Sequence, residues 1–232
     1  MDLGIAGKVA LVTAASKGLG RGAALALARE GCRVAICARD AGPLEATAAE
    51  LGPETLAIAA DVAEPEAPAR LTAATIERFG ALDIVVANAG GPPKGRALEI
   101  DDEAILAAVQ ANLLASIRLA RAAAPTMREA GWGRIVLLTS IAVLEPIPDL
   151  AASNIARAGL WAWARTAARD LADDGITLNL VCPGLHATDR VRELGAGGRL
   201  GDPEDLGRLI AFLCSTSASF ISGAAIPIDG AA

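Results

Sequence analysis

Short runs of apolar, often β-branched residues alternate along this chain with longer segments rich in alanine and leucine. The short runs have the length of strands buried on both faces, and the longer segments have the apolar spacing of helices that cover such strands. This alternation predicts βαβ units around a parallel sheet. We expect strands at Val9–Thr13, Arg33–Cys37, Thr55–Ala59, Asp83–Ala87, Arg134–Thr139, Thr177–Val181 and Ala225–Ile228.

Helical segments separate these strands. In the longest of them, Ile105, Val109, Leu113 and Ile117 form an apolar ridge at a spacing of four residues. We expect residues 1–232 to form one α/β domain, a Rossmann-type doubly wound parallel sheet of about seven strands with helices on both faces. The predicted helices are Leu19–Glu30, Pro43–Leu51, Glu66–Phe79, Asp101–Ala130, Asp149–Asp173 and Pro203–Ser215.

Composition narrows the class of partner. Hydrophobic residues make up 53% of the 232 residues and charged residues 21%, which is typical of a packed globular protein. The formal net charge is -6 and no block of lysine or arginine occurs, so we expect a small-molecule substrate and neither nucleic acid nor membrane as partner. We see no cationic leader and no run of about 18 apolar residues, and we expect a cytoplasmic protein. The four cysteines lack C-x-x-C spacing and there is one histidine, which predicts buried, reduced thiols and no metal site.

The turn after the first predicted strand has the composition of a phosphate-binding loop. Gly18 and Gly20 would let the backbone approach a pyrophosphate, and the following helix supplies unpaired N–H groups. The spacing resembles the T-G-x-x-x-G-x-G motif of the short-chain dehydrogenase/reductase family, with Ala14 at the first glycine. We expect the methyl group of Ala14 to be tolerated if φ is negative there. Further motifs of that family follow in order: Asp61, Asn88-Ala89-Gly90, Asn112, Ser140, Pro183-Gly184 with Thr188, and Gly223 with Asp229-Gly230.

The resemblance implies a nicotinamide cofactor, and the end of the second predicted strand indicates NADP. A carboxylate there would bind the ribose 2′-hydroxyl of NAD, whereas Ala38 and Arg39 suit a 2′-phosphate, with Lys17 as a second cation. The alternative is that both cations are solvated surface charges. The resemblance also implies that Asp61 contacts the adenine, Asn88 the adenosine ribose and Thr188 the nicotinamide side. The expected NADP(H) contacts are Thr13, Ala15, Ser16, Lys17, Gly18, Leu19, Gly20, Arg39, Asp61, Val62, Asn88, Ala89, Gly90, Arg157, Pro183, Gly184, Leu185 and Thr188.

The expected catalytic centre departs from the family pattern because the chain contains no tyrosine. In the family, a serine orients the substrate carbonyl, a tyrosine thirteen residues later donates the proton, and a lysine four residues further on lowers the tyrosine pKa. Here Ser140 fits the pattern, but Ser153 and Arg157 stand at the other two positions. A serine hydroxyl is a far weaker acid than a phenol, and arginine keeps its proton. We expect Asn112, Ser140, Ser153 and Arg157 to form the altered site, with Arg157 holding the nicotinamide ribose and stabilising oxyanion charge.

Other interpretations of these residues stay open. Ser153 could be an ordinary serine at the start of a helix, and Arg157 a salt-bridged surface arginine. His186 is either a substitute proton donor or an incidental loop residue. The segment Asp189–Leu200 is shorter than the helical lid of resembling enzymes, so we expect an open substrate pocket.

Three functions follow. The leading one is an NADP(H)-dependent oxidoreductase for a carbonyl or alcohol, similar to 3-oxoacyl carrier-protein reductases, with an altered Ser-Ser-Arg centre. The alternative is a catalytically weak or inactive NADP(H)-binding subunit that acts through oligomer assembly. Halohydrin dehalogenases also pair serine with arginine but keep the tyrosine and lose the nucleotide loop, so they rank third. By the resemblance we expect a homotetramer or homodimer formed through the two longest helices, with Leu113 and Trp161 as candidates for burial there.

Overall fold

The computed structural model describes residues 2–195 and 197–231. Seven parallel strands form one sheet: β1 (Val9–Val12), β2 (Arg33–Ala38), β3 (Leu56–Ala59), β4 (Ile84–Ala87), β5 (Gly133–Leu138), β6 (Ile176–Pro183) and β7 (Ala225–Ile228). Their order in the sheet is β3-β2-β1-β4-β5-β6-β7. The chain therefore builds outward from β1 in one direction and from β4 in the other, and ligands of such sheets bind at this switch point. The predicted doubly wound α/β fold is confirmed.

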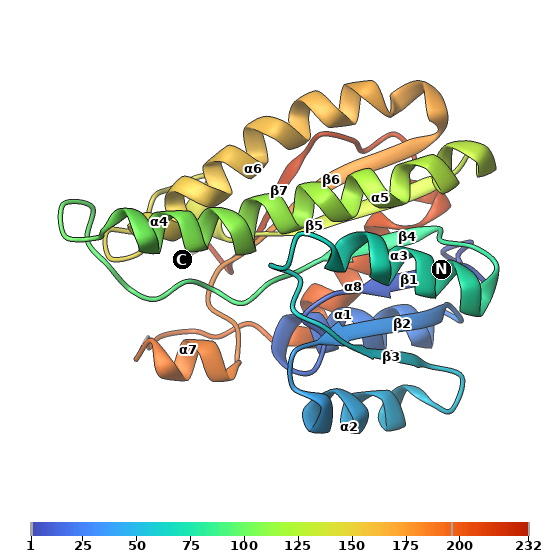
Figure 1. Cartoon of the computed structure of the whole chain (residues 1–232), viewed down its shortest axis with the longest axis horizontal. Coiled ribbons are helices and arrows are strands. Elements are labelled where there is room, and N and C mark those ends of the chain that lie inside the picture. Colours follow the sequence, from blue (N-terminus) through green and yellow to red (C-terminus); the bar gives the residue numbers. More distant parts are fainter. Residues whose placement is uncertain (1, 196, 232) are drawn as a thin grey trace.

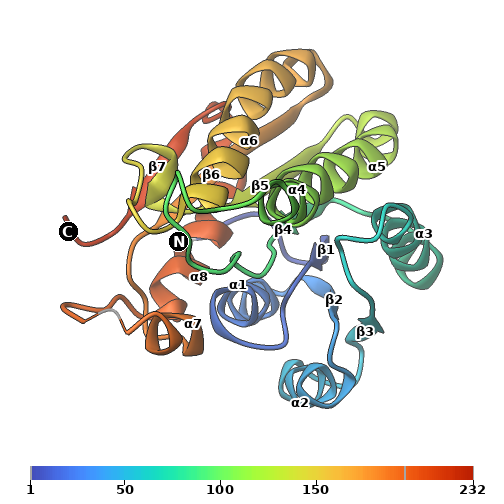
Figure 2. The ribbon, with the colours of Figure 1, turned by 60° about the vertical axis from the view of Figure 1, so that its left-hand side comes forward.

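Helices cover both faces of the sheet (Figure 1; Figure 2). They are α1 (Gly18–Arg29), α2 (Ala41–Leu51), α3 (Ala67–Phe79), α4 (Asp102–Val109), α5 (Ala115–Ala130), α6 (Ala151–Asp170), α7 (Asp189–Glu193) and α8 (Pro203–Leu213). One layer contains α3, α4, α5 and α6, and the other contains α1, α2 and α8. The short helix α7, which the sequence did not predict, stands clear of both layers at the lower left of Figure 1.

Successive residues of each central strand face opposite layers. In β1, Leu11 belongs to the buried cluster that contains Leu119 of α5, whereas Val12 belongs to the cluster that contains Leu27 of α1. Both faces of the strand are thus buried, which explains why the strands are continuously apolar instead of alternating.

The predicted helices differ from the observed ones at their ends, and the two longest differ most. The helix expected over Asp101–Ala130 begins one residue later, because Asp101 caps it by accepting a hydrogen bond from Ala104 N at 2.8 Å. A π-helical turn at Gln110–Leu114 joins α4 to α5. The helix expected over Asp149–Asp173 is shorter, since α6 ends at Asp170 and a 3₁₀ turn follows.

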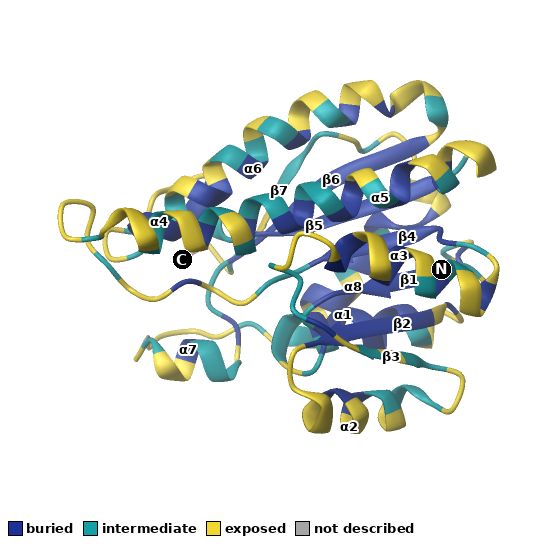
Figure 3. Cartoon of the chain, viewed as in Figure 1, coloured by how far each residue is buried: buried dark blue, intermediate teal, exposed yellow. Residues whose placement is uncertain are grey.

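The continuous helical stretch over residues 102–130 is unexpectedly apolar. It is long enough to span a membrane and contains an 18-residue window with a mean hydropathy of 1.3, a criterion that helices in protein cores also meet. Only 33% of its most apolar window is buried within the chain. Leu106 of α4 is 64% exposed and Ile155 of α6 is 47% exposed. Exposed positions recur along both helices (Figure 3). The helices α4 and α6 therefore leave apolar side chains uncovered.

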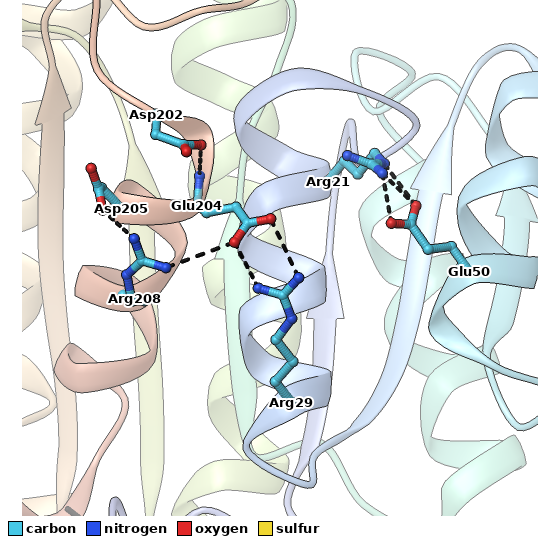
Figure 4. A network of polar contacts seen from close by, with 7 residues as sticks. All are labelled: Arg21, Arg29, Glu50, Asp202, Glu204, Asp205 and Arg208. Atoms are coloured by element: carbon cyan, nitrogen blue, oxygen red, sulfur yellow. Dashed lines mark hydrogen bonds and ion pairs between the residues drawn. The ribbon is translucent and has the colours of Figure 1, made fainter.

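Helix α1 is held close to α8. A Cβ atom on Gly207 would lie 2.4 Å from the carbonyl oxygen of Gly22, so only glycine permits this approach. Two exposed ion pairs join α1 to the helices beside it: Arg21–Glu50 joins it to α2, and Arg29–Glu204 joins it to α8 (Figure 4). Such pairs contribute little stability individually, but they show that α1 lies between α2 and α8. The N-terminus of α1 is thereby fixed at the carboxyl end of β1.

Candidate active site

The turn between β1 and α1 has the geometry of a phosphate-binding loop. Lys17 is the N-cap of α1, but its side chain caps none of the backbone N–H groups described there, so these remain available to an anion. A Cβ atom on Gly20 would lie 2.3 Å from the carbonyl oxygen of Ala14 and 2.8 Å from Nδ2 of Asn88. Gly18 has φ of +58°, which favours glycine. These features fit the close approach of a dinucleotide pyrophosphate.

Ala14 adopts φ of +46°, so the condition of a negative φ for tolerating its methyl group is not met. Its neighbours hold the turn in this conformation. The carbonyl oxygen of Ala14 accepts a hydrogen bond from Asn88 Nδ2 at 3.2 Å, and Thr13 Oγ1 donates to Asn88 O at 2.7 Å. A left-handed conformation costs a residue with a Cβ atom about 1–2 kcal/mol, which the sheet and helix packing around the turn must offset.

Replacing Ala14 with glycine is expected to increase the free energy of unfolding by about 1 kcal/mol. Glycine adopts this φ without the steric cost that alanine has, and this gain exceeds the additional conformational entropy that glycine loses on folding. Urea denaturation measures the change. Ala15→Gly is the matched control, since Ala15 is buried and its φ is not positive, and it should lower stability. Loss of stability in both variants would show that Ala14 is not strained.

The two cations predicted to bind a 2′-phosphate are both exposed: Arg39 directly follows β2, and Lys17 is the N-cap of α1. Arg39 forms no ion pair with any residue that the structure describes. Lys17 Nζ lies 3.7 Å from Asp189 Oδ2, and Asp189 also pairs with Arg192. The buried Ala38 offers no carboxylate to a ribose hydroxyl. Arg39 is therefore available to an anion, and its role in binding remains a prediction.

The other residues predicted to contact the cofactor lie at the carboxyl edge of the sheet. Asp61 Oδ1 accepts a hydrogen bond from Ala63 N at 2.9 Å. Thr188 caps α7, and its Cγ2 atom would lie 3.4 Å from a Cβ atom on Gly18, so the start of α7 packs against the phosphate-binding turn. The remaining predicted contacts follow the ends of strands: Ala15, Ser16 and Leu19 after β1, Val62 after β3, Ala89 and Gly90 after β4, and Pro183, Gly184 and Leu185 at the end of β6.

Three predicted catalytic residues form one buried hydrogen-bonded group. Arg157 Nε donates to Ser153 Oγ at 3.0 Å, and Arg157 Nη2 donates to Asn112 Oδ1 at 3.2 Å. Arg157 Nη1 donates to Leu138 O, at the carboxyl end of β5, at 3.4 Å. Arg157 is 8% exposed and forms no ion pair within the described residues. The interpretation of Arg157 as a salt-bridged surface arginine is therefore wrong.

The positions of these side chains follow from local structure. Ser153 and Arg157 are one turn apart on α6, so they share a face of the helix. Asn112 belongs to the π-helical turn, a feature that is frequent at functional sites. Ser140 follows β5 and is half-buried, and its Oγ accepts a hydrogen bond from Ala142 N at 3.2 Å. Among the hydrogen bonds of the described chain, none joins Ser140 to Ser153 or Arg157.

The pKa of Arg157 depends on its burial and on two ionisable neighbours, Cys182 and Arg190. Burial away from water lowers the pKa of its guanidinium to about 10, and the charge of Arg190 on α7 contributes to the lowering. Cys182 on β6 is the other ionisable neighbour, and burial raises the pKa of its thiol. Arg157 is thus a cation at neutral pH and Cys182 a neutral thiol. The sequence did not single out Arg190 for this site, because no motif marks it.

His186 takes part in the packing of the loop after β6. It is 2% exposed, and its Nδ1 atom lies 3.2 Å from Gly184 O. A Cβ atom on Gly201 would lie 2.9 Å from its Nε2 atom, so the ring packs against that segment. Its hydrogen bonds in the described chain do not include Ser140, Ser153 or Arg157. The structure therefore places His186 in the loop scaffold, outside the Arg157 group.

Two cations join α7 to the loop after β4. Arg190 Nη2 donates to Pro92 O, and Lys94 Nζ donates to Leu194 O at 2.7 Å. The segment Asp189–Leu200, predicted to leave an open pocket, thus begins as a short helix held against another loop. Neither contact was foreseeable, since each pair is about a hundred residues apart along the chain.

Comparison with known proteins agrees with this geometry. The family model described as Enoyl-(Acyl carrier protein) reductase matches residues 13–231. Dehydrogenase/reductase SDR family member 4 of Homo sapiens is 31% identical over 97% of this chain and 87% of its own, and a 3-oxoacyl-[acyl-carrier-protein] reductase of Synechocystis is 34% identical over 96% of both. The L-sorbose reductase of Gluconobacter frateurii, solved with NADPH and L-sorbose, has a TM-score of 0.93 and 32% identity over 99% of this chain and 98% of its own. Because these similarities span nearly the whole chain, it belongs to the short-chain dehydrogenase/reductase family.

Proposed function

We propose that this chain is an NADP(H)-dependent oxidoreductase that acts on a carbonyl or alcohol substrate through an altered Ser-Ser-Arg centre. The observation that carries the proposal is the position of the Arg157 group at the carboxyl edge of the same sheet as the phosphate-binding turn. A bound NADPH supplies a hydride. The similar L-sorbose reductase, which was solved with NADPH, supports this choice of cofactor. The backbone N–H groups at the start of α1 would bind the pyrophosphate, and Arg39 with Lys17 would bind the 2′-phosphate.

The preference for NADPH over NADH depends on Arg39. Arg39→Ala is expected to weaken NADPH binding by about tenfold or more, the equivalent of 1.4 kcal/mol, and to leave NADH binding nearly unchanged, because only NADPH carries the 2′-phosphate. Titration calorimetry with both cofactors measures the two dissociation constants. Arg169→Ala is the control, since it removes the same charge from an exposed site at the end of α6. Equal affinity of the unmodified protein for the two cofactors would refute the assignment.

The Arg157 group would act on the substrate by hydrogen bonding and charge. Ser153 Oγ accepts from Arg157 Nε, so its own hydroxyl hydrogen is available to a substrate carbonyl. Arg157 stabilises negative charge without releasing a proton. A positioned acid such as tyrosine typically increases the reaction rate by about 10²–10⁴-fold. Its loss therefore slows a reductase without abolishing hydride transfer.

A second candidate is a catalytically inactive NADP(H)-binding subunit of an oligomer. The observation in its favour is that Arg157 directs hydrogen bonds from Nε and from both terminal nitrogens to the protein itself. Incubation with NADPH and 3-oxoacyl thioesters, quinones or small ketones separates the two candidates. Oxidation of NADPH supports the enzyme, whereas NADPH binding without turnover supports the inactive subunit.

The uncovered apolar side chains of α4 and α6 support a homodimer or homotetramer. We predict that light scattering at micromolar concentration gives the mass of two or four chains, since contact between two copies would bury these side chains. Leu106→Arg is expected to lower the mass toward one chain. Ala49→Arg on the distant helix α2 is the control and should leave it unchanged. A single-chain mass for the unmodified protein would contradict this prediction.

A further inference from the structure

The Arg157 group contains a buried positive charge that no described carboxylate neutralises. Its hydrogen-bond acceptors, Ser153 Oγ, Asn112 Oδ1 and Leu138 O, are all neutral. A buried charge without a counter-ion is costly, and the cost falls when an anion binds beside it. The environment of Arg157 therefore favours a ligand with negative charge on the atom that approaches it.

The ionisable side chains that act on Arg157 do not include a carboxylate among the described residues. Arg190 of α7 acts on it as a second cation, and the Nη1 atom of Arg190 lies 3.9 Å from Glu193 Oε2. Strand β6 contributes Cys182, whose Sγ atom lies 3.3 Å from Thr139 Oγ1 and which burial keeps as a neutral thiol. An oxyanion would be attracted by both guanidinium groups and would reduce their mutual repulsion.

The same residues lack an effective proton donor. Serine is a very weak acid, arginine keeps its proton, and burial makes the Cys182 thiol a weaker acid still. His186 is occupied in the loop after β6. When hydride adds to an isolated ketone, the charge that develops on a single alkoxide oxygen needs a proton at once. When hydride adds to the β-carbon of a conjugated carbonyl, the charge spreads over an enolate whose conjugate acid is an enol. For a quinone that enol rearranges to a phenol, with a pKa of about 10.

We propose that the Arg157 group is an oxyanion site for a conjugated carbonyl substrate, either a quinone or an α,β-unsaturated ketone. This inference rests on the proposed function, which supplies the hydride. A C–H bond forms at the β-carbon of the conjugated carbonyl as the hydride brings two electrons. The Cα–Cβ π pair moves to a new double bond between Cα and the carbonyl carbon, and the carbonyl π pair moves to the oxygen. The cofactor is oxidised and the substrate reduced. The resulting oxyanion is released from the site and takes its proton from water.

Two hydroxyl groups are suited to hold that oxygen. Ser153 Oγ and Ser140 Oγ each accept a hydrogen bond within the protein, from Arg157 Nε and Ala142 N respectively. Each hydroxyl therefore keeps its hydrogen for another acceptor. Arg157 supplies charge behind Ser153 and polarises its hydroxyl group. The site stabilises a negative oxygen without donating a full proton to it.

Binding of 4-nitrophenol in the presence of NADP⁺ tests the proposal without turnover. The phenolate and the neutral phenol differ in visible absorbance, so a spectrum reports which form is bound. We expect the protein to bind the phenolate and to lower the pKa of the bound phenol by about one unit or more, a tenfold change in ionisation. Arg157→Gln should abolish this shift, and Arg169→Gln should retain it. Binding of the neutral phenol, or no binding, overturns the proposal.

Two further variants keep the test decisive if Arg157→Gln does not fold. Arg157→Lys retains the charge and should retain phenolate binding, whereas Ser153→Ala removes one hydroxyl donor and should reduce the shift. An unchanged shift in Ser153→Ala overturns the role of that hydroxyl. NADP⁺ binding is measured by calorimetry in the same samples. Failure to bind NADP⁺ contradicts the proposed function, whereas NADP⁺ binding without phenolate binding contradicts only the oxyanion site.

Turnover provides an independent comparison between matched substrates. Cyclohexenone and cyclohexanone share a ring and a carbonyl group but differ in conjugation. We expect NADPH-dependent reduction of cyclohexenone at its β-carbon, to cyclohexanone, to be faster than reduction of cyclohexanone by about tenfold or more, since hydride addition there gives a delocalised enolate and cyclohexanone gives a localised alkoxide. Equal rates, faster reduction of cyclohexanone, or reduction of neither overturns the assigned substrate class.

Discussion

Gly20→Ala is expected to weaken NADPH binding by about a hundredfold or more, the equivalent of 2.7 kcal/mol. The added Cβ atom would lie 2.3 Å from the carbonyl oxygen of Ala14 and 2.8 Å from Asn88 Nδ2. Neither the backbone of Ala14 nor the start of α1 can yield without moving the other, because the turn is bonded to β4 through Thr13 and Asn88. The N–H groups at the start of α1 would therefore lose their common orientation toward a pyrophosphate.

Titration calorimetry with NADPH measures this loss. Gly42→Ala is the matched control, because Gly42 lies on α2 in open space and its φ is not positive, so the same methyl group should leave NADPH binding unchanged. Circular dichroism and urea denaturation separate loss of binding from loss of fold, since overpacking itself costs about 1–3 kcal/mol. Unaltered affinity in a folded Gly20→Ala protein would show that the turn after β1 is not the pyrophosphate site.

The strands were predictable because both faces of the sheet are covered. A strand buried on both faces must be apolar throughout, as β4 is. The edge strand β7 is only partly buried, and its apolar run was nevertheless predicted with the residues that form it, Ala225–Ile228. Helix starts were less accurate. Helix α2 begins at Ala41, two residues before the predicted Pro43, since proline is tolerated anywhere in the first turn. The five residues of α7 are too few to show helical periodicity, and that helix was not predicted.

The candidate site was predictable where it depends on local spacing. A separation of four residues on a helix places Ser153 and Arg157 on one face, and the structure confirms their contact. Burial of Arg157 was not predictable, because it depends on Asn112 and Leu138, which are 45 and 19 residues away along the chain. The positive φ of Ala14 was also missed, since it follows from contacts between β1 and β4 and not from the residue type.

Changing Ser153 to tyrosine together with Arg157 to lysine is expected to increase NADPH-dependent reduction of saturated ketones by about tenfold or more, the equivalent of 1.4 kcal/mol in the barrier. Tyrosine restores a phenolic acid that can protonate a localised alkoxide, and a lysine one helical turn away lowers its pKa. Both changes are needed, because Arg157 Nε donates to Ser153 Oγ and a tyrosine alone would lose that arrangement without gaining the lysine.

The ratio of rates between cyclohexenone and cyclohexanone separates the possible origins of such a gain. If the natural centre works as an oxyanion site because it lacks an acid, the restored acid should help cyclohexanone most, and the preference for cyclohexenone should fall. The single variant Ser153→Tyr is the control and should give little gain, since Arg157 cannot exchange a proton with the phenol. A double variant that loses an activity present in the natural protein would mean that Ser153 and Arg157 belong to a different mechanism. The natural centre would then not be a tyrosine-dependent reductase centre that has lost its acid.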